Sequence, residues 1–297
     1  MSRLIGIDWG NSNARAFRYD AEGAVVGERH GPYGILTIRD RGFEAALAAL
    51  AGDWLDGPPP TFILCGAIGS RQGWLEAPYA PCPAGEADLI AALKPLLTRL
   101  GPAWIVPGVN SETPDHVEVL RGEETKTLDA LAAGWGGVVV SPGTHSKWLR
   151  LAGGRITAIR SFMTGELYAV LRGHSILGAL MAPGPHDQAA FDLGVTRALA
   201  DPAVTSLLLS VRAEGLFGRI APEAAASFLS GILIGAEVRG GLAWCEAGTP
   251  LRLIASPGLQ GLLARALELA GRTDVIVDDA SVATAKGLWR IGRTLVG

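Results

Sequence analysis

One strand-and-turn plan occurs twice in this chain, and it constrains the fold more than any other feature of the sequence. Residues 4–8 have the short apolar pattern of a strand, a glycine turn follows, and residues 14–19 alternate like a returning strand. A further glycine turn and a third strand complete a predicted meander. The same order returns over residues 138–162, where Gly143 takes the place of Gly10. The repetition indicates a duplicated α/β lobe, and the alternative is a coincidence of two common meanders.

Strand and helix patterns alternate after each meander, which is typical of a sheet whose faces are covered by helices. In the first half we expect helices at 43–55, 87–100 and 124–133, and buried strands at 62–68 and 103–109. In the second half we expect helices at 165–181, 188–200, 224–244, 260–270 and 282–291, and strands at 251–255 and 275–278. We therefore predict an N-terminal lobe of residues 1–134, a C-terminal lobe of residues 135–297, a cleft between them, and a last helix that packs back on the first lobe.

The composition argues against several classes of protein. The 297 residues include 26 Lys and Arg against 29 Asp and Glu, so the net charge of −3 gives no basic field for nucleic acid. No apolar stretch approaches the roughly 20 residues that cross a bilayer, and Asp8 interrupts any signal-peptide core. We expect a cytoplasmic protein without nucleic-acid or membrane partners. Its three cysteines form no CxxC motif and are expected to be buried free thiols.

Four familiar catalytic motifs are missing from the sequence. None of the four lysines follows a glycine, which excludes a Walker A loop. There is no GxSxG for a serine hydrolase, no HExxH for a zinc enzyme, and no GxGxxG after a strand for a nicotinamide dehydrogenase. The chemistry must therefore come from other elements.

The two hydroxyl-rich glycine turns are suited to binding an anion. At Gly10 and Gly143 the absence of a Cβ lets backbone N–H groups approach phosphate oxygens, and Ser12 and Thr144 add hydroxyl donors. Asp8, at the end of the first strand, is placed to hold Mg²⁺. The simpler interpretation is that Asp8 caps the turn and that the hydroxyls satisfy local backbone groups.

The turns and several longer segments resemble a known family. Residues 5–10 and 141–148 are similar to the two phosphate loops of the sugar kinase, Hsp70 and actin superfamily. More closely, the chain resembles the 2-keto-3-deoxygalactonate kinases (2-dehydro-3-deoxygalactonokinases). The segments that carry this resemblance are residues 69–79, 105–109, 121–125, 142–148, 162–167 and 174–178. It implies an α/β fold of two ribonuclease-H-like lobes, the actin-like ATPase and sugar kinase fold, around a central nucleotide cleft.

The resemblance also implies an activity and its cofactors. The enzyme would use ATP and Mg²⁺ to phosphorylate the 6-hydroxyl of 2-dehydro-3-deoxy-D-galactonate, giving 2-dehydro-3-deoxy-6-phosphogalactonate. Asp8 would hold the metal. The residues implied to bind ATP are Gly10, Asn11 and Ser12, then Gly143, Thr144, His145, Ser146 and Lys147, and finally Ser256, Pro257 and Gly258. This last segment departs from the superfamily, in which a Gly-Gly pair is common at the adenosine loop.

Phosphoryl transfer to a hydroxyl requires an acceptor for its proton, and a carboxylate usually supplies it. Glu123 and Glu124 lie at a loop-to-helix junction before the second meander, where related sugar kinases carry a catalytic aspartate. Either residue is a candidate. The alternative is that both are first-turn carboxylates that stabilise a helix N-terminus.

A sugar acid also needs donors for its own carboxylate, and an arginine fork suits that group. The residues expected to bind substrate are Gly69, Ser70, Arg71, Trp74, Glu76, Thr164 and Glu166. For several residues a structural alternative stays open: Trp74 as a core side chain, Glu166 as a first-turn helix residue, and Tyr79 and His174 as buried side chains. Arg121 either steers phosphate or pairs with a surface carboxylate.

Two rival functions also fit the sequence. One is another kinase of the superfamily or a phosphohydrolase resembling the exopolyphosphatases, and the other is a non-catalytic nucleotide or sugar sensor. The sequence leaves the oligomeric state open, a homo-oligomer included.

Overall fold

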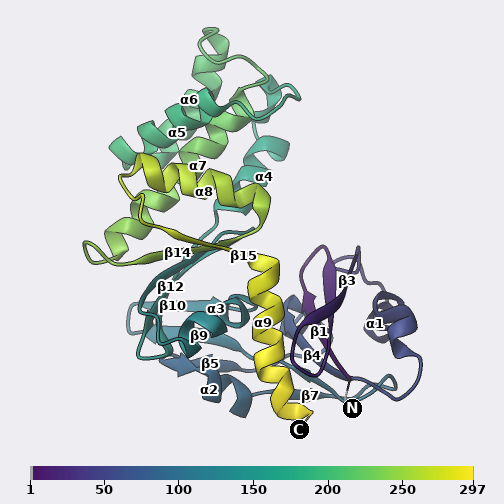
Figure 1. Cartoon of the computed structure of the whole chain (residues 1–297). Helices are drawn as coiled ribbons and strands as arrows, with labels where there is room; N and C mark the ends of the chain where they lie inside the picture. The colour runs from purple at the N-terminus through teal and green to yellow at the C-terminus, as the bar shows by residue number, and fades with distance from the viewer. Residues whose placement is uncertain (1–2, 297) are drawn as a thin grey trace. The chain divides into compact units, whose positions relative to one another are not determined.

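The computed structural model describes residues 3–296 (Figure 1). The chain divides into two compact units. The first unit runs to Gly136 and also takes in Leu149–Ile159 and the segment from Asp279 onward, and the second comprises Gly137–Trp148 and Arg160–Asp278. The division therefore passes through the second meander, and it assigns the C-terminal segment to the first unit.

A mixed six-stranded sheet forms the centre of the first unit, in the order β3-β2-β1-β4-β8-β7. Its strands are β1 (Leu4–Trp9), β2 (Ala14–Tyr19), β3 (Val25–Gly31), β4 (Thr61–Gly66), β7 (Lys94–Leu96) and β8 (Ala103–Ile105). The first meander pairs antiparallel, as predicted, whereas β4 runs parallel to both β1 and β8. Every residue from Phe62 to Gly66 is buried. Burial on both faces explains the unbroken apolar run of this strand.

Helices from both ends of the chain cover this sheet. α1 (Phe43–Ala51) packs on β2 and β3, and α9 (Ala280–Gly292) packs on β1 and β4, where Figure 1 shows it in yellow. α9 also lies against α3 (Glu123–Ala132). This contact is close, because a Cβ on Gly287 would lie 1.9 Å from the carbonyl oxygen of Thr125. The last helix is thus a core element of the first unit.

The remaining strands form two further sheets. A small sheet has the order β10-β9-β5, with β5 (Tyr79–Pro81), β9 (Gly108–Thr113) and β10 (His116–Leu120). The other sheet has the order β15-β14-β11-β12-β13-β6. Its strands are β6 (Ala84–Gly85), β11 (Gly137–Ser141), β12 (Ser146–Ala152), β13 (Arg155–Phe162), β14 (Leu251–Ala255) and β15 (Ile276–Asp279). The adjacent strands β11, β12 and β13 are the second predicted meander.

The second unit carries most of the helices. They are α4 (Thr164–His174), α5 (Gln188–Ala200), α6 (Val204–Leu216), α7 (Ala225–Trp244) and α8 (Pro257–Leu269). α7 is long and apolar enough to cross a membrane by length and composition, but 67% of its apolar window is buried within the structure. That burial is typical of a core helix. Short 3-10 helices lie at Gly52–Leu55, Ala67–Gly69, Gly178–Leu180 and Arg293–Leu295.

Glycine makes possible the close crossing of α5 and α7. A Cβ on Gly231 would lie 2.1 Å from the carbonyl oxygen of Phe191, and one on Gly194 would lie 2.4 Å from that of Phe228. Neither distance is tolerable for real atoms. The two helices can therefore pack at this separation only with glycine at the crossing, which accounts for part of the chain's glycine content.

Some sequence predictions of secondary structure were wrong. The expected helix at 87–100 is α2 (Glu86–Ala91) followed by β7, because Pro95 cannot continue a helix. The expected strand at 103–109 is split between β8 and β9, which belong to different sheets, and Pro107 lies between them. α6 was not predicted. Among the described residues Cys65, Cys82 and Cys245 form no disulfide, as expected, but of these three Cys65 alone is fully buried.

The α5–α7 crossing predicts opposite effects for two glycine substitutions within helices. Gly231→Ala should lower the free energy of unfolding by about 1–3 kcal/mol, since the new methyl group overlaps a backbone carbonyl. Gly261→Ala is the matched control, because Gly261 lies in α8 and an added Cβ would meet no atom of residues 3–296 within 4 Å. It should raise the unfolding free energy by up to about 1 kcal/mol. Urea unfolding measures both, and equal effects would contradict the close packing.

Candidate functional site

The first glycine turn joins β1 to β2. The backbone N–H of Gly10 donates to the carbonyl of Asn13 at 2.9 Å, which closes the turn tightly. Asp8 comes just before the turn, in register with Arg15 of β2 and with Cys65 of β4. Its carboxylate is half-buried. The structure thus places Asp8 at the carboxyl end of a central strand, beside the turn.

A second segment, residues 34–36, fixes the outer side of this turn. Its N–H groups donate to the carbonyls of Ser12, Gly10 and Asn11 at 3.2, 3.1 and 3.1 Å. A Cβ on Gly34 would lie 2.2 Å from the carbonyl oxygen of Asn11, so this contact requires glycine. The side chains of Asn11 and Ser12 stay exposed. They are therefore free to act as donors to a bound anion.

The N-terminus of α3 meets the ends of β1 and β4 through two glycines. Gly66 and Gly122 have φ values of 88° and 110°, a region that favours glycine. A Cβ on Gly122 would lie 3.3 Å from the Cα of Gly66. A Cβ on Gly66 would in turn lie 3.4 Å from Oδ1 of Asp8. This approach brings the first residues of α3 to the strand end that carries Asp8.

The two glutamates at the start of α3 differ in exposure. Glu124 is fully buried and accepts hydrogen bonds from the N–H of Gly122 at 2.6 Å and from the hydroxyl of Thr125 at 2.9 Å. Glu123 is half-buried, and its Oε2 accepts from the N–H of Arg121 at 3.2 Å. Burial, reinforced by the neighbouring Glu123, raises the pKa of Glu124 to about 7. Glu123 is therefore the glutamate of this pair that solvent and ligands can reach.

Lys126 is a cation within this acidic group that the sequence analysis did not select. Burial lowers its pKa, but the carboxylates of Glu123 and Asp8 act against burial and the net direction is upward. Cys65 lies in the same group, and burial raises its pKa well above the usual range, so its thiol stays protonated and faces Oδ1 of Asp8 at 3.8 Å. The signal for Lys126 in the sequence is its spacing of one helical turn from Glu123.

The loop expected to bind the sugar acid begins at the 3-10 helix after β4. Arg71 is 84% exposed and forms an ion pair with Glu76 at 3.1 Å. Trp74 packs inward, stacked on Phe43 at 6.0 Å between ring centroids. Ser70 is half-buried. Of the predicted substrate residues, Arg71 and Glu76 thus contact each other at the surface, whereas Trp74 contributes to the core.

The second glycine turn joins β11 to β12 and packs against the start of α4. The N–H of Glu166 donates to the carbonyl of Thr144 at 2.9 Å. A Cβ on Gly165 would lie 2.4 Å from the carbonyl oxygen of Gly143. Nε2 of His145 is hydrogen-bonded to the carboxylate of Glu166. The structure therefore brings together residues that the sequence analysis assigned separately to nucleotide and to substrate.

Ser146 and Lys147 follow this turn in β12. Ser146 is buried, and Lys147 donates from Nζ to the hydroxyl of Ser161 at 2.7 Å. Lys147 therefore has a partner within the second unit.

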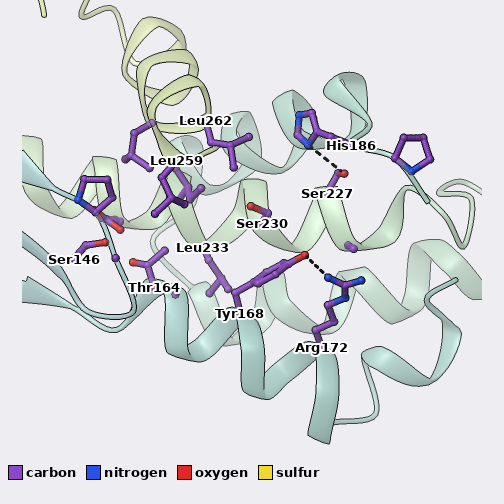
Figure 2. A pocket seen from close by; sticks show the side chains of 18 of the residues that line it. Ser146, Thr164, Tyr168, Arg172, His186, Ser227, Ser230, Leu233, Leu259 and Leu262 are labelled. Carbon is purple, nitrogen blue, oxygen red and sulfur yellow. Dashed lines mark hydrogen bonds between the residues drawn. The ribbon is translucent and has the colours of Figure 1, made fainter. Parts of the chain in front are cut away.

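A cavity of about 290 Å³ lies beside the second turn and entirely within the second unit (Figure 2). Gly143 and Ser146 line it. The helices around it contribute Thr164, Tyr168 and Arg172 from α4, Ser227, Ser230, Leu233 and Glu237 from α7, and Leu259, Leu262 and Leu263 from α8. The leucines of α8 form an apolar wall, while α4 and α7 contribute hydroxyl groups and a guanidinium. An apolar wall with a few placed polar groups is typical of a site for a small organic ligand.

Glu237 is a buried carboxyl group at this cavity. It is 2% exposed, accepts from Nε1 of Trp148 at 3.1 Å, and its Oε2 has no hydrogen-bond partner within residues 3–296. Burial raises its pKa, while the nearby hydroxyls of Thr164 and Ser146 act in the opposite direction. The group is thus held close to the second glycine turn in a poorly solvated place.

The segment predicted as the adenosine loop begins α8. Ser256 is the N-cap residue, and its carbonyl accepts from the N–H groups of Leu259 and Gln260. A Cβ on Gly258 would meet no atom of the described chain within 4 Å, so this position is open. The cavity is lined by the leucines that follow this segment in α8, beginning with the next residue, Leu259, and not by Ser256, Pro257 or Gly258.

Most polar residues of this cavity were not predicted from the sequence. Tyr168 and Arg172 were not predicted, and they share one face of α4 with Thr164, which was expected to bind substrate. The 3.4 Å contact of Arg172 with the Tyr168 hydroxyl is visible in Figure 2. The available signal was their spacing of four residues. In α7 the signal was the presence of Ser230 and Glu237 in an otherwise apolar helix.

No group of three or more His, Cys, Asp or Glu side chains able to hold a metal ion occurs in the described part of the chain. The single carboxylate of Asp8 remains as a candidate ligand. Mg²⁺ suits such a site, because in phosphoryl-transfer enzymes it is held by one or two carboxylates together with water and substrate phosphates.

Known proteins match this chain over nearly its whole length. Residues 8–291 match a family model described as 2-keto-3-deoxy-galactonokinase. A relative from Escherichia coli strain K12, named 2-dehydro-3-deoxygalactonokinase, is 34% identical over 295 residues, which cover 99% of each chain. A Rhizobium meliloti relative, provisionally given the same name, is 38% identical over 97% of this chain and 96% of its own.

Solved structures share the fold. A Sinorhizobium meliloti crystal structure, provisionally described as the same kinase, has a TM-score of 0.90 and 36% identity, and covers 98% of this chain and 99% of that one. The ADPNP-bound activator of a 2-hydroxyisocaproyl-CoA dehydratase from Clostridium difficile has a TM-score of 0.53 at 10% identity, with 99% and 95% coverage. At that identity the likeness concerns the fold alone. The α/β fold expected from the sequence, that of the actin-like ATPases and sugar kinases, is confirmed.

The buried carboxyl of Glu124 predicts a pH-dependent stability. Its folded pKa of about 7 lies above the ordinary value of 4.5, so its proton stabilises the folded state below about pH 4.5, and this contribution is lost as pH rises through 7. Between pH 5 and pH 8 the wild type should lose about 2–3 kcal/mol of unfolding free energy relative to Glu124→Gln. Urea unfolding at the two pH values measures this, with the exposed Glu246→Gln as control. The same pH dependence in all three proteins would contradict the assignment.

Proposed function

Because this chain belongs to the 2-keto-3-deoxy-galactonokinase family, we propose that it transfers the γ-phosphoryl group of ATP to the 6-hydroxyl of 2-dehydro-3-deoxy-D-galactonate. The product is 2-dehydro-3-deoxy-6-phosphogalactonate. The observation that carries this proposal is the family match over residues 8–291, which contains both glycine turns and the carboxylates beside the first turn. The reaction would take place in the cytoplasm, where ATP and the sugar acid meet.

The second unit would bind the nucleotide. The leucine wall of α8 suits the flat apolar face of adenine, and the hydroxyl groups on α4 and α7 suit the ribose. Gly143 and Ser146 line the same cavity and would meet the phosphates, with Thr144, His145 and Lys147 around them. The segment Ser256–Gly258 would contribute by starting the helix that carries the leucines.

The first unit would supply the charges for phosphoryl transfer. Asp8 would hold Mg²⁺, which neutralises charge on the ATP phosphates when it is bound. The exposed side chains of Asn11 and Ser12 and the N–H groups of the Gly10 turn would donate to phosphate oxygens. Lys126 adds a positive charge within the same acidic group.

Glu123 is the residue that we assign as proton acceptor. As the oxygen of the 6-hydroxyl bonds to the γ-phosphorus, the bond from that phosphorus to the β–γ bridging oxygen breaks, ADP leaves, and the hydroxyl proton passes to Glu123. Glu124 cannot take this role in the same way, because both of its oxygens accept hydrogen bonds at the buried start of α3. It would instead hold the helix start in place.

Substrate dependence tests the proposed activity. With ATP and Mg²⁺, the protein should release ADP only when the sugar acid is present, and phosphorus NMR should show a phosphomonoester on carbon 6. Equal ADP release with and without the sugar acid would indicate a phosphohydrolase. Binding of both ligands without any release would indicate a sensor.

Single substitutions test the choice of proton acceptor. Glu123→Gln should lower kcat by about 10²- to 10⁴-fold and leave ATP affinity nearly unchanged, because it removes the acceptor but keeps the shape. Glu124→Gln preserves the acceptor for the Gly122 N–H and should retain most of kcat. The assignment would be reversed by the opposite result, a large loss in Glu124→Gln with little loss in Glu123→Gln.

A further inference from the structure

Arg121 is a charged side chain of the first unit with unused donors. Its Nη2 donates to the carbonyl of Ala77 at 2.9 Å, and its guanidinium carbon lies 4.4 Å from the ring centroid of Tyr79. Its Nε and Nη1 are buried and have no hydrogen-bond partner anywhere in residues 3–296. Buried donors of a cation are rarely left unsatisfied, because desolvation without an acceptor is costly. The two nitrogens therefore call for an acceptor that comes from outside the chain.

The loop that begins at Gly69 packs closely against this arginine. A Cβ on Gly69 would lie 2.8 Å from Nη1 of Arg121, so glycine lets the guanidinium lie against the loop backbone. The next residue, Ser70, has a buried hydroxyl that also lacks a partner within the described chain. The N–H of Ala77 donates to the carbonyl of Gly69 at 2.9 Å and joins the two ends of the loop. An unsatisfied cation thus lies against Gly69, and the next residue of the loop carries an unsatisfied hydroxyl group.

The acceptor that suits these donors is an anion. The contact between Arg121 and Glu123 uses the backbone N–H of Arg121, so the guanidinium is not neutralised by it. Arg121 forms no ion pair with any Asp or Glu of the described residues. Arg71 differs, since it is 84% exposed and already paired with Glu76. A ligand carboxylate would meet Arg121 in a dry environment, where a charge-assisted hydrogen bond is strong.

We propose that Arg121, together with the hydroxyl of Ser70, binds the carboxylate of the sugar-acid substrate. This inference rests on the proposed function and names the group that selects an acid over a neutral sugar. The substrate carries its carboxylate and its reactive hydroxyl at opposite ends of its carbon chain, and Arg121 and Glu123 lie on either side of Gly122. One segment would therefore hold both ends of the substrate. Because both nitrogens are covered, the loop from Gly69 to Tyr79 must shift when the acid enters.

Paired substrates test this assignment. The wild type and Arg121→Gln are compared on the sugar acid and on its neutral primary amide, which keeps the reactive hydroxyl. We expect Arg121→Gln to lower kcat/KM at least about 100-fold on the acid and less than about fivefold on the amide, so that the preference for the acid disappears. Arg71→Gln and the surface variant Arg219→Gln should keep that preference. Equal losses on both substrates, or loss of the preference in Arg71→Gln instead, would overturn the proposal.

One further measurement distinguishes a failure of this proposal from a failure of the proposed function. Calorimetric titration with the sugar acid alone measures binding without turnover, and Arg121→Gln should weaken it at least about 100-fold. A wild type that binds the acid through Arg121 but does not phosphorylate it would refute the kinase proposal and leave this inference standing. If Arg121→Gln does not fold, Ser70→Ala and Arg121→Lys replace it, and a preference for the acid that is unchanged in both would refute the inference.

Discussion

The candidate site of the first unit depends on one backbone contact, that between Gly66 and Gly122. Both residues have a positive φ, and a side chain on Gly122 would press against the Cα of Gly66. The contact allows the N-terminus of α3 to reach the ends of the central strands, where Asp8 lies. Three charged residues are positioned around Gly122 as a result. Arg121 precedes this glycine, the accessible Glu123 follows it, and the buried Glu124 accepts a hydrogen bond from the Gly122 N–H. This backbone contact thus positions both Arg121, the residue proposed to bind the substrate carboxylate, and Glu123, the proposed proton acceptor.

The cavity of the second unit has little positive charge with which to bind an anion. It combines a leucine wall with hydroxyl groups, and the glycine turn beside it is pinned by the close approach of Gly165 to Gly143. Among the described residues that line the cavity, Arg172 is the single Lys or Arg side chain. Anionic phosphates would therefore be met mainly by backbone N–H groups and hydroxyls, which are fixed dipoles that need little rearrangement. This agrees with the net charge of −3 for the chain, because local donors make a basic surface unnecessary.

The sequence revealed the repeated meanders and the main helices because turn chemistry and apolar periodicity are local properties. It was misled at residues 87–100, where apolar spacing suggested a helix that Pro95 interrupts. The different roles proposed for Glu123 and Glu124 could not be predicted from the sequence, because the two residues are neighbours of the same type and differ in burial. The unsatisfied hydrogen-bond donors of Arg121 could not be predicted from the sequence either. They depend on a contact with Gly69, which is distant in sequence and carries no periodic signal.

The position of α9 has a consequence for the order of folding during synthesis. This helix covers β1 and β4 and packs tightly on α3, yet its residues are translated after the entire second unit. Until they emerge from the ribosome, the central strands of the first unit present an uncovered apolar face. The first part of the chain to be made is therefore among the last to be completed, and an apolar face left uncovered at that stage favours aggregation of the nascent chain.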